Sequence, residues 1–124
     1  MPIYTYKTIR KSLGFERFEL LGFDGGESSA GANGIFDDCD EDSICVCRPG
    51  TYCVMYSFFV EGDGCIALYL NGSLIKGSRK NGKGRLDGQS YVFLQKPVSA
   101  HLTVKNCGRE VLHVLKGCLI VFAV

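Results

Sequence analysis

Short apolar runs separated by glycine and turn residues recur along the chain from residue 43 onward. These runs are rich in aromatic and β-branched residues, which favour strands over helices. No stretch of this region repeats with the 3.6-residue period of a helix. The pattern therefore predicts an all-β sandwich or barrel. The expected strands are 43–48, 52–60, 65–70, 73–76, 89–94, 101–106, 110–115 and 118–124.

Glycine-containing segments predict where these strands end. Turns are expected at 48–51 and 61–64. Asn71-Gly72 lies between two apolar runs, which is the strongest short-range signal for a β-hairpin. Residues 77–88 combine four glycines with five charges, and we expect an exposed loop there.

The first 22 residues carry a weaker pattern. Tyr4, Tyr6 and Thr8 alternate with polar residues like an edge strand. Phe15, Phe18 and Leu21 fit one face of a short helix, but Phe18, Leu20 and Phe23 also suit an opening strand. We therefore divide the chain into an N-terminal arm or tether, 1–22, and a β domain, 23–124. Basic residues in the arm would make it the attachment point.

Several predicted strands are apolar on both faces. In residues 52–60, tyrosine, valine and phenylalanine on one face oppose cysteine, methionine and phenylalanine on the other. A strand of a two-sheet monomer normally alternates apolar with polar residues. An uncovered second face would exceed the few hundred Å² of apolar patch that is typical of a monomer. The pattern indicates an oligomer; a thick monomer core, or loops that cover the outer face, is the alternative.

Composition excludes several function classes. The 124 residues suit one domain, and no apolar run reaches the roughly 18 residues of a membrane-spanning helix. The first residues lack the apolar stretch of a secretory signal. A net charge of +1 gives no overall basic field for nucleic acid. Only two histidines are present, so we expect neither a cupin-like metal centre nor any other enzymatic site.

Acidic and basic residues are segregated along the chain. Residues 24–63 hold nine acids and one base, a charge of −8, and residues 76–116 hold nine bases and two acids, a charge of +7. Opposite poles on identical copies can set the register of an assembly. The alternative is that both segments are solvated loops.

Within these segments, two clusters are candidate ligand sites. Five carboxylates in residues 37–42 could attract Ca²⁺, with a solvated acidic turn as the alternative. The candidate metal ligands are Asp37, Asp38, Asp40 and Asp42. The basic cluster could meet an anion or an acidic glycan. Its members are Lys76, Arg79, Lys80, Lys83 and Arg85.

The seven cysteines include no pair with the two-residue spacing of zinc or redox motifs. They would be small buried apolar residues, cross-links within an assembly, or metal ligands. The odd number leaves at least one thiol free or paired between chains. The candidates for cross-linking are Cys39, Cys45, Cys47, Cys53 and Cys107.

Three segments resemble known families. The Gly-x-Tyr-x-Val-x-Tyr of residues 50–56 and the ending Gly-Cys-Leu-Ile-Val-Phe of residues 117–122 resemble signatures of the complement-type globular head. Residues 64–78, a strand, an Asn-Gly turn, a short strand and Gly-Ser, look like the C-terminal domain of bacterial spore-surface collagen-like glycoproteins. Val54 and Cys118 stand where the head signature has aromatic residues.

This resemblance implies a tumour-necrosis-factor-like (TNF-like) jelly-roll β-sandwich of about 8–10 antiparallel strands that assembles as a homotrimer. It further implies a structural role on the endospore surface, in the coat or exosporium, with other coat proteins or surface glycans as partners. A trimeric ligand- or glycan-binding head is the alternative function. The candidates for core or trimer interface are Tyr52, Tyr56, Phe58, Phe59, Tyr69 and Phe122.

Overall fold

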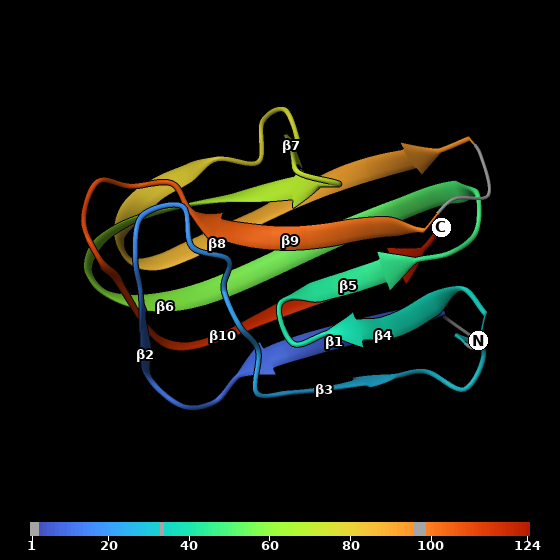
Figure 1. The fold of residues 1–124 in the computed structure, drawn as a ribbon, viewed down its shortest axis with the longest axis horizontal. Coiled ribbons are helices and arrows are strands. Elements are labelled where there is room, and N and C mark those ends of the chain that lie inside the picture. Colours follow the sequence, from blue (N-terminus) through green and yellow to red (C-terminus); the bar gives the residue numbers. More distant parts are fainter. Residues whose placement is uncertain (1–2, 33, 96–98) are drawn as a thin grey trace.

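The computed structural model describes residues 3–32, 34–95 and 99–124, with the side chains of residues 38–40 left out. It is built from ten antiparallel β-strands (Figure 1), and the described residues contain no helix, so none could cross a membrane. The strands are β1 (Tyr4–Ile9), β2 (Leu13–Phe15), β3 (Gly25–Ser28), β4 (Phe36–Asp40), β5 (Ser43–Val46), β6 (Gly50–Leu70), β7 (Ser73–Leu74), β8 (Lys80–Leu94), β9 (Ala100–Asn106) and β10 (Leu112–Ala123). The all-β prediction is confirmed.

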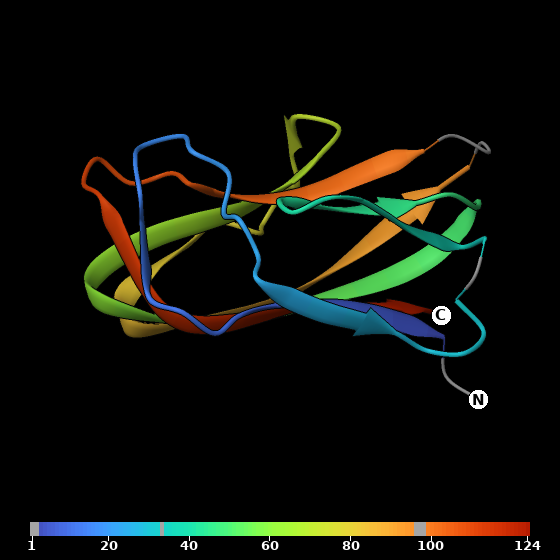
Figure 2. The same cartoon turned by 60° about the horizontal axis from the view of Figure 1, so that its bottom comes forward.

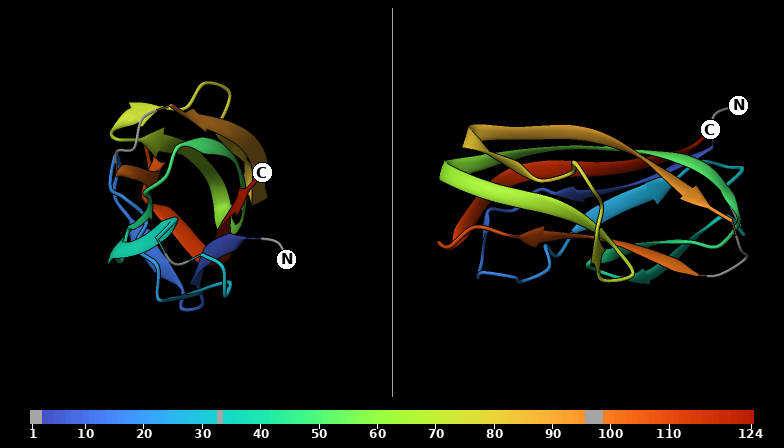
Figure 3. Two further views of the ribbon diagram at one scale, coloured as in Figure 1. Left: turned by 90° about the vertical axis from the view of Figure 1, so that its right-hand side faces the viewer. Right: turned by 90° about the horizontal axis from the view of Figure 1, so that it is seen from above.

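The strands form two packed layers, which Figure 2 shows from the side and Figure 3 from one end and from above. The first sheet has the order β3-β1-β10-β6-β8, and β2 pairs with β10 at its end. The second sheet has the order β4-β5-β9-β6-β8, with the short β7 paired to β6. Both chain ends lie at the same end of the sandwich (Figure 1).

β6 and β8 belong to both sheets, because each bends from one layer into the other. Up to Val60, β6 pairs with β10, and from Ile66 it pairs with β9. The register against β8 shifts between Phe59 and Asp63, and Gly62 has φ +73°, which marks a bulge. The predicted turn at 61–64 is therefore wrong: those residues continue a bent strand.

The predicted loop at 77–88 is also wrong for most of its length. Residues from Lys80 onward belong to β8 and pair with β6. Their glycines and charges fit a strand at the free edge of both sheets, since an edge strand needs few apolar side chains and is protected by charge.

Two further strand predictions have different outcomes. The Asn71-Gly72 hairpin is confirmed: both residues have positive φ, and β6 pairs with β7 on either side. The predicted strands at 110–115 and 118–124 are a single strand, β10, interrupted only by a bulge between Val114 and Lys116.

The N-terminal segment contributes a strand to the sheet. β1 pairs with β10 on one side and β3 on the other, and its Ile9 is buried in the core. The short-helix alternative for residues 15–21 is wrong, and β1 is not an edge strand. The boundary at residue 22 stays a prediction, but residues 4–9 share the hydrogen bonding of the first sheet.

Alternate residues of β6 fill the space between the layers. Tyr52, Tyr56 and Phe58 are all buried, so these three interface-or-core candidates lie in the core. The hydroxyls of the two tyrosines have partners: the Tyr52 hydroxyl donates to the Arg48 carbonyl at 2.7 Å and the Tyr56 hydroxyl to the Ser78 carbonyl at 2.6 Å. Burial raises the pKa of both tyrosines.

Candidate functional site

The outward side of the first sheet carries an apolar surface that nothing in the described chain covers. We call it the open face. Its members come from four neighbouring strands and lie opposite one another in register. They are Tyr4, Tyr6, Cys53, Met55, Phe59, Tyr91, Cys118, Ile120 and Phe122.

The residues of the open face form rows across the strands. One row runs Tyr4–Phe122–Cys53–Tyr91, and the next begins Tyr6–Ile120–Met55. The Tyr4 ring lies 6.4 Å from that of Tyr6 and 6.2 Å from that of Phe122. Met55 is 40% exposed and Tyr91 54%, although both are large and largely apolar.

Cations stand at one end of this face. The ring of Phe59 lies below two of them, with Lys116 Nζ 4.8 Å and Arg85 Cζ 5.5 Å from its centroid. Arg85 also pairs with Asp87 at 2.8 Å. The hydrogen bond from Ser57 Oγ and the nearby Arg85 hold the pKa of the Asp87 carboxyl below its ordinary value.

A shallow hollow opens in the middle of the open face. Its volume is about 430 Å³, and side chains of β6, β8 and β10 line it, among them Met55, Gln89, Cys118 and Ile120. Burial raises the pKa of the Cys118 thiol, so this cysteine stays protonated and behaves as an apolar group. Arg85 and Asp87 also line the hollow, but most of its exposed lining is apolar, so it suits an inserted apolar side chain.

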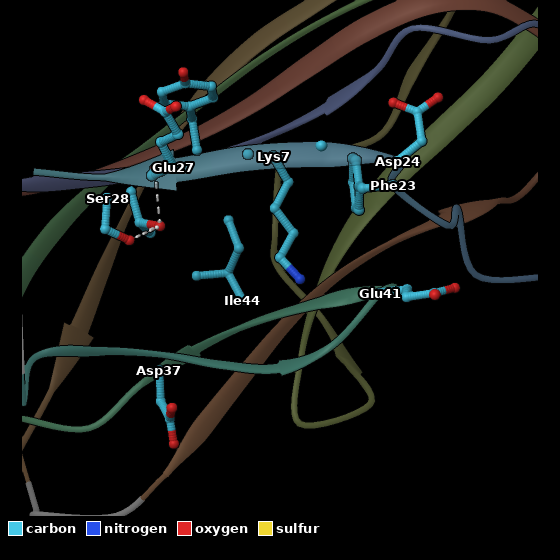
Figure 4. A pocket seen from close by; sticks show the side chains of 12 residues that line it. Lys7, Phe23, Asp24, Glu27, Ser28, Asp37, Glu41 and Ile44 are labelled. Carbon is cyan, nitrogen blue, oxygen red and sulfur yellow. Dashed lines mark hydrogen bonds between the residues drawn. The ribbon is translucent and has the colours of Figure 1, made fainter.

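The opposite edge of the molecule is acidic. Between β3 and β4 lies a cavity of about 740 Å³, with Phe23 and Ile44 among its lining residues (Figure 4). Lys7 points into the cavity from β1 (Figure 4) and has an interaction partner of its own. The acidic lining residues are Asp24, Glu27, Asp37 and Glu41.

One of these acids has a structural task. The Asp24 carboxylate accepts hydrogen bonds from the backbone N–H groups of Arg10 and Lys11, each at 2.9 Å. The Lys11 hydrogen bond is the main reason that the pKa of Asp24 lies below its ordinary value. Asp24 therefore fixes the turn that follows β1.

The predicted calcium ligands are only partly described. Asp37 is exposed and lines the acidic cavity, and Asp42 is partly exposed. The side chains of Asp38 and Asp40 lie outside the described residues. Among the described residues, no three His, Cys, Asp or Glu side chains gather as metal ligands. Calcium binding stays a prediction.

The predicted basic cluster spreads over two regions instead of one loop. Lys76 and Arg79 precede β8 and are exposed. The other three, Lys80, Lys83 and Arg85, follow the free edge of the sandwich on β8. The basic pole and the acidic cavity thus lie at opposite edges of the first sheet, as Figure 1 shows for β8 and β3.

The cysteines divide between disulfides and free thiols. Cys65 and Cys107 are joined, and Cys45 also takes part in a disulfide, with its sulfur 3.2 Å from His101 Nδ1. The free thiols among the described cysteines are Cys47, Cys53 and Cys118. The side chain of Cys39 lies outside the described residues. Two cross-linking candidates, Cys45 and Cys107, are thus already oxidised.

The remaining interface candidates lie on different surfaces. Phe59 and Phe122 belong to the open face, whereas Tyr69 lies on the second sheet, where Lys105 Nζ sits 4.4 Å from its ring centroid. Sequence reasoning placed Met55 on the second face of its strand, but it did not name Met55, Ile120 or Tyr91 as interface candidates. Their alternation with core residues was visible, but which strands are neighbours was not.

Comparisons with known proteins identify the fold. No protein-family model and no curated protein sequence matches the chain. Among solved structures, the globular domain of zebrafish complement 1qA protein superposes with a TM-score of 0.73 at 10% identity, covering 97% of this chain and 94% of that one. Murine APRIL gives 0.71 at 9% identity, covering all of both chains, and Eiger TNF from S. frugiperda gives 0.68 at 10% identity, covering 100% and 94%. The chain has the TNF-like jelly-roll fold.

Proposed function

We propose that this chain is a self-assembling structural protein, a homotrimeric TNF-like head that forms part of the coat or exosporium of a bacterial spore. The observation that carries the assembly is the open face. Rows of tyrosine, phenylalanine, methionine and isoleucine stand on a sheet whose other side is already packed. Covering that surface would yield about 25 cal/mol for each Å² of apolar area removed from water.

The two charged edges support a cyclic arrangement over a two-fold dimer centred on either edge. In a dimer of that kind the edge meets itself, so the acidic cavity would face acid or β8 would face base. In a ring, the edge of one copy meets a different surface of the next. The cations on β8 and the carboxylates around the β3–β4 cavity are then complementary.

The place of action rests on the resemblance of residues 64–78 to spore-surface glycoproteins. The strand, hairpin and Gly-Ser of that segment are β6, β7 and the residues before β8. Ser78 of the Gly-Ser pair is fully buried and donates to the Leu68 and Ile75 carbonyls. The matched segment is therefore held together by buried hydrogen bonds, which fits a structural role.

Two experiments test the two parts of this proposal. Sedimentation equilibrium at low micromolar concentration should give three times the 13.6 kDa subunit mass. A species of 13.6 kDa alone would refute self-assembly. Immunogold labelling of sporulating cells should place the protein in the outer spore layers, and label confined to vegetative cells would refute the spore role.

A trimeric glycan-binding head is the second candidate. The observation that favours it is an aromatic ring and a cation together on the second sheet: Lys105 Nζ lies 4.4 Å from the ring centroid of the half-buried Tyr69. Exposed Lys76 and Arg79 add positive charge for an acidic sugar. A glycan array at modest salt separates the candidates: selective binding that Tyr69→Ala abolishes would favour the head.

A further inference from the structure

The disulfide between Cys65 and Cys107 joins two sulfurs in unlike surroundings. Cys65, on β6, is only 4% exposed, whereas Cys107, just after β9, is partly exposed. Arg79 Nε donates a hydrogen bond to Cys65 Sγ at 3.3 Å. One sulfur therefore belongs to a buried residue beside a cation, and the other to a partly exposed residue.

We propose that this disulfide is a thiol–disulfide exchange site through which the chain becomes covalently linked to a cysteine-containing partner. The thiolate sulfur of the partner bonds to Cys107 Sγ, and the Cys65–Cys107 bond breaks. The electron pair of that bond goes to Cys65 Sγ. The products are a mixed disulfide at Cys107 and a Cys65 thiolate beside Arg79, and the proton of the incoming thiol goes to solvent.

Two physical factors set this direction of attack. Exchange requires access to the attacked sulfur, and Cys107 is the more accessible of the two. Exchange is also faster when the leaving sulfur is stabilised as a thiolate, which a neighbouring guanidinium does. Arg79 contacts Cys65 Sγ. The greater exposure of Cys107 and the positive charge beside Cys65 therefore both favour Cys65 as the leaving sulfur.

The loop around Cys107 is held independently of the disulfide. Cys107 N–H donates to the Cys65 carbonyl at 3.1 Å, and Gly108 N–H donates to Asn106 Oδ1 at 2.9 Å. Asn106 is 1% exposed, and its Nδ2 donates to the Phe15 and Glu110 carbonyls. These bonds keep Cys107 in place when the S–S bond opens, so exchange needs no unfolding.

The same loop keeps the reaction reversible. A Cβ on Gly108 would lie 3.3 Å from Cys65 Cβ, so glycine permits the close approach of the loop to β6. Cys65 therefore stays near the mixed disulfide and can attack it again. All of these contacts lie within one chain, so the exchange does not depend on the trimer.

Reduced glutathione serves as the probe. The free thiols of the native protein are first blocked with N-ethylmaleimide; glutathione is then added, and the reaction is quenched with iodoacetamide. Cleavage after Lys105 and Arg109 releases Asn106–Arg109, which contains Cys107 alone. Mass spectrometry should find glutathione on this peptide and carbamidomethyl on Cys65. Glutathione on Cys65, or an adduct that forms only in denaturing urea, would overturn the proposal.

Variants separate the role of Arg79 from a merely structural one. Arg79→Gln should slow adduct formation about threefold or more, and Arg79→Lys should retain part of the rate. Arg109→Gln removes a neighbouring exposed arginine and should react like the unaltered protein. Equal rates for Arg79→Gln and Arg109→Gln, with both folded by circular dichroism, would show that the guanidinium does not select the leaving sulfur.

Discussion

At the scale of single residues, the close approach of two strands depends on Gly117. A Cβ built at this position overlaps the ring of Phe58, which lies directly opposite on β6 and is fully buried. The glycine of the head-like ending is thus explained by packing: β10 and β6 leave no space for a side chain over that ring.

Gly117→Ala should therefore destabilise the fold. We expect a loss of about 1–3 kcal/mol, the usual cost of overpacking, from urea denaturation followed by tyrosine fluorescence. Gly22→Ala is the control, because a Cβ there meets nothing within 4 Å. Equal stability of the two variants would mean that Phe58 moves aside freely.

Asp24 should make the stability of the fold depend on pH in the acid range. Its pKa in the folded protein lies below the ordinary value of 3.8, chiefly because the Lys11 N–H donates to it. A lowered pKa stabilises the fold above the unfolded value, and this stabilisation is lost as pH falls through the folded pKa. The melting temperature should fall less steeply below about pH 4 in Asp24→Asn than in the unaltered protein. Glu61→Gln, at an exposed position, should keep the steep fall; identical acid profiles of all three would contradict the role of Asp24.

At the scale of elements, the sequence predicts where strands lie better than it predicts where they end. Alternation and the Asn71-Gly72 pair predict β9, the hairpin and both halves of β6, but divide β6 at a turn that does not exist. Gly62 predicts a turn but lies in a bulge. Glycine with positive φ occurs in turns and in bulges, and only the pairing of the neighbouring residues distinguishes the two. Residues 80–85 of β8 contain no apolar run. This edge strand is held in the sheet by its hydrogen bonds to β6, so its sequence does not show the usual strand pattern. The sequence predicts that some strands have a second apolar face, but the rows of the open face cannot be predicted from it, because they form only when strands distant in sequence pair.

The strand β1 is the clearest case of an element that pattern alone misjudges. Its alternating pattern predicts an edge strand, but β1 lies between β3 and β10, with Ile9 1% exposed. Ile9→Ala should cost about 2–5 kcal/mol in urea denaturation, the range for buried large-to-alanine changes. Leu13→Ala, at a position 45% exposed on β2, should cost far less. Similar small losses for both would restore the view that the N-terminus is a dispensable arm.

At the scale of the whole molecule, the separation of charge along the sequence becomes a separation in space. Carboxylates gather around the β3–β4 cavity, and cations follow β8 at the other edge. If these poles guide one copy onto the next, association should slow about tenfold or more between low salt and 0.5 M salt, because exposed charges are screened. Light scattering after dilution jumps would measure this. Equal association rates at both salt concentrations would leave apolar burial as the only driving force.

The open face decides whether the molecule exists as a single subunit. Met55 stands in its middle, beside the hollow, and is not part of the core, so a charge there should leave the subunit folded. In an assembly, Met55→Glu would bury an unpaired carboxylate in each copy, at a cost of several kcal/mol, and sedimentation should show single subunits. Leu74→Glu places the same charge on the 54% exposed position of β7, away from the first sheet, and should sediment like the unaltered protein. If Met55→Glu keeps the assembled mass while Leu74→Glu loses it, copies meet through the second sheet and the open face has another occupant.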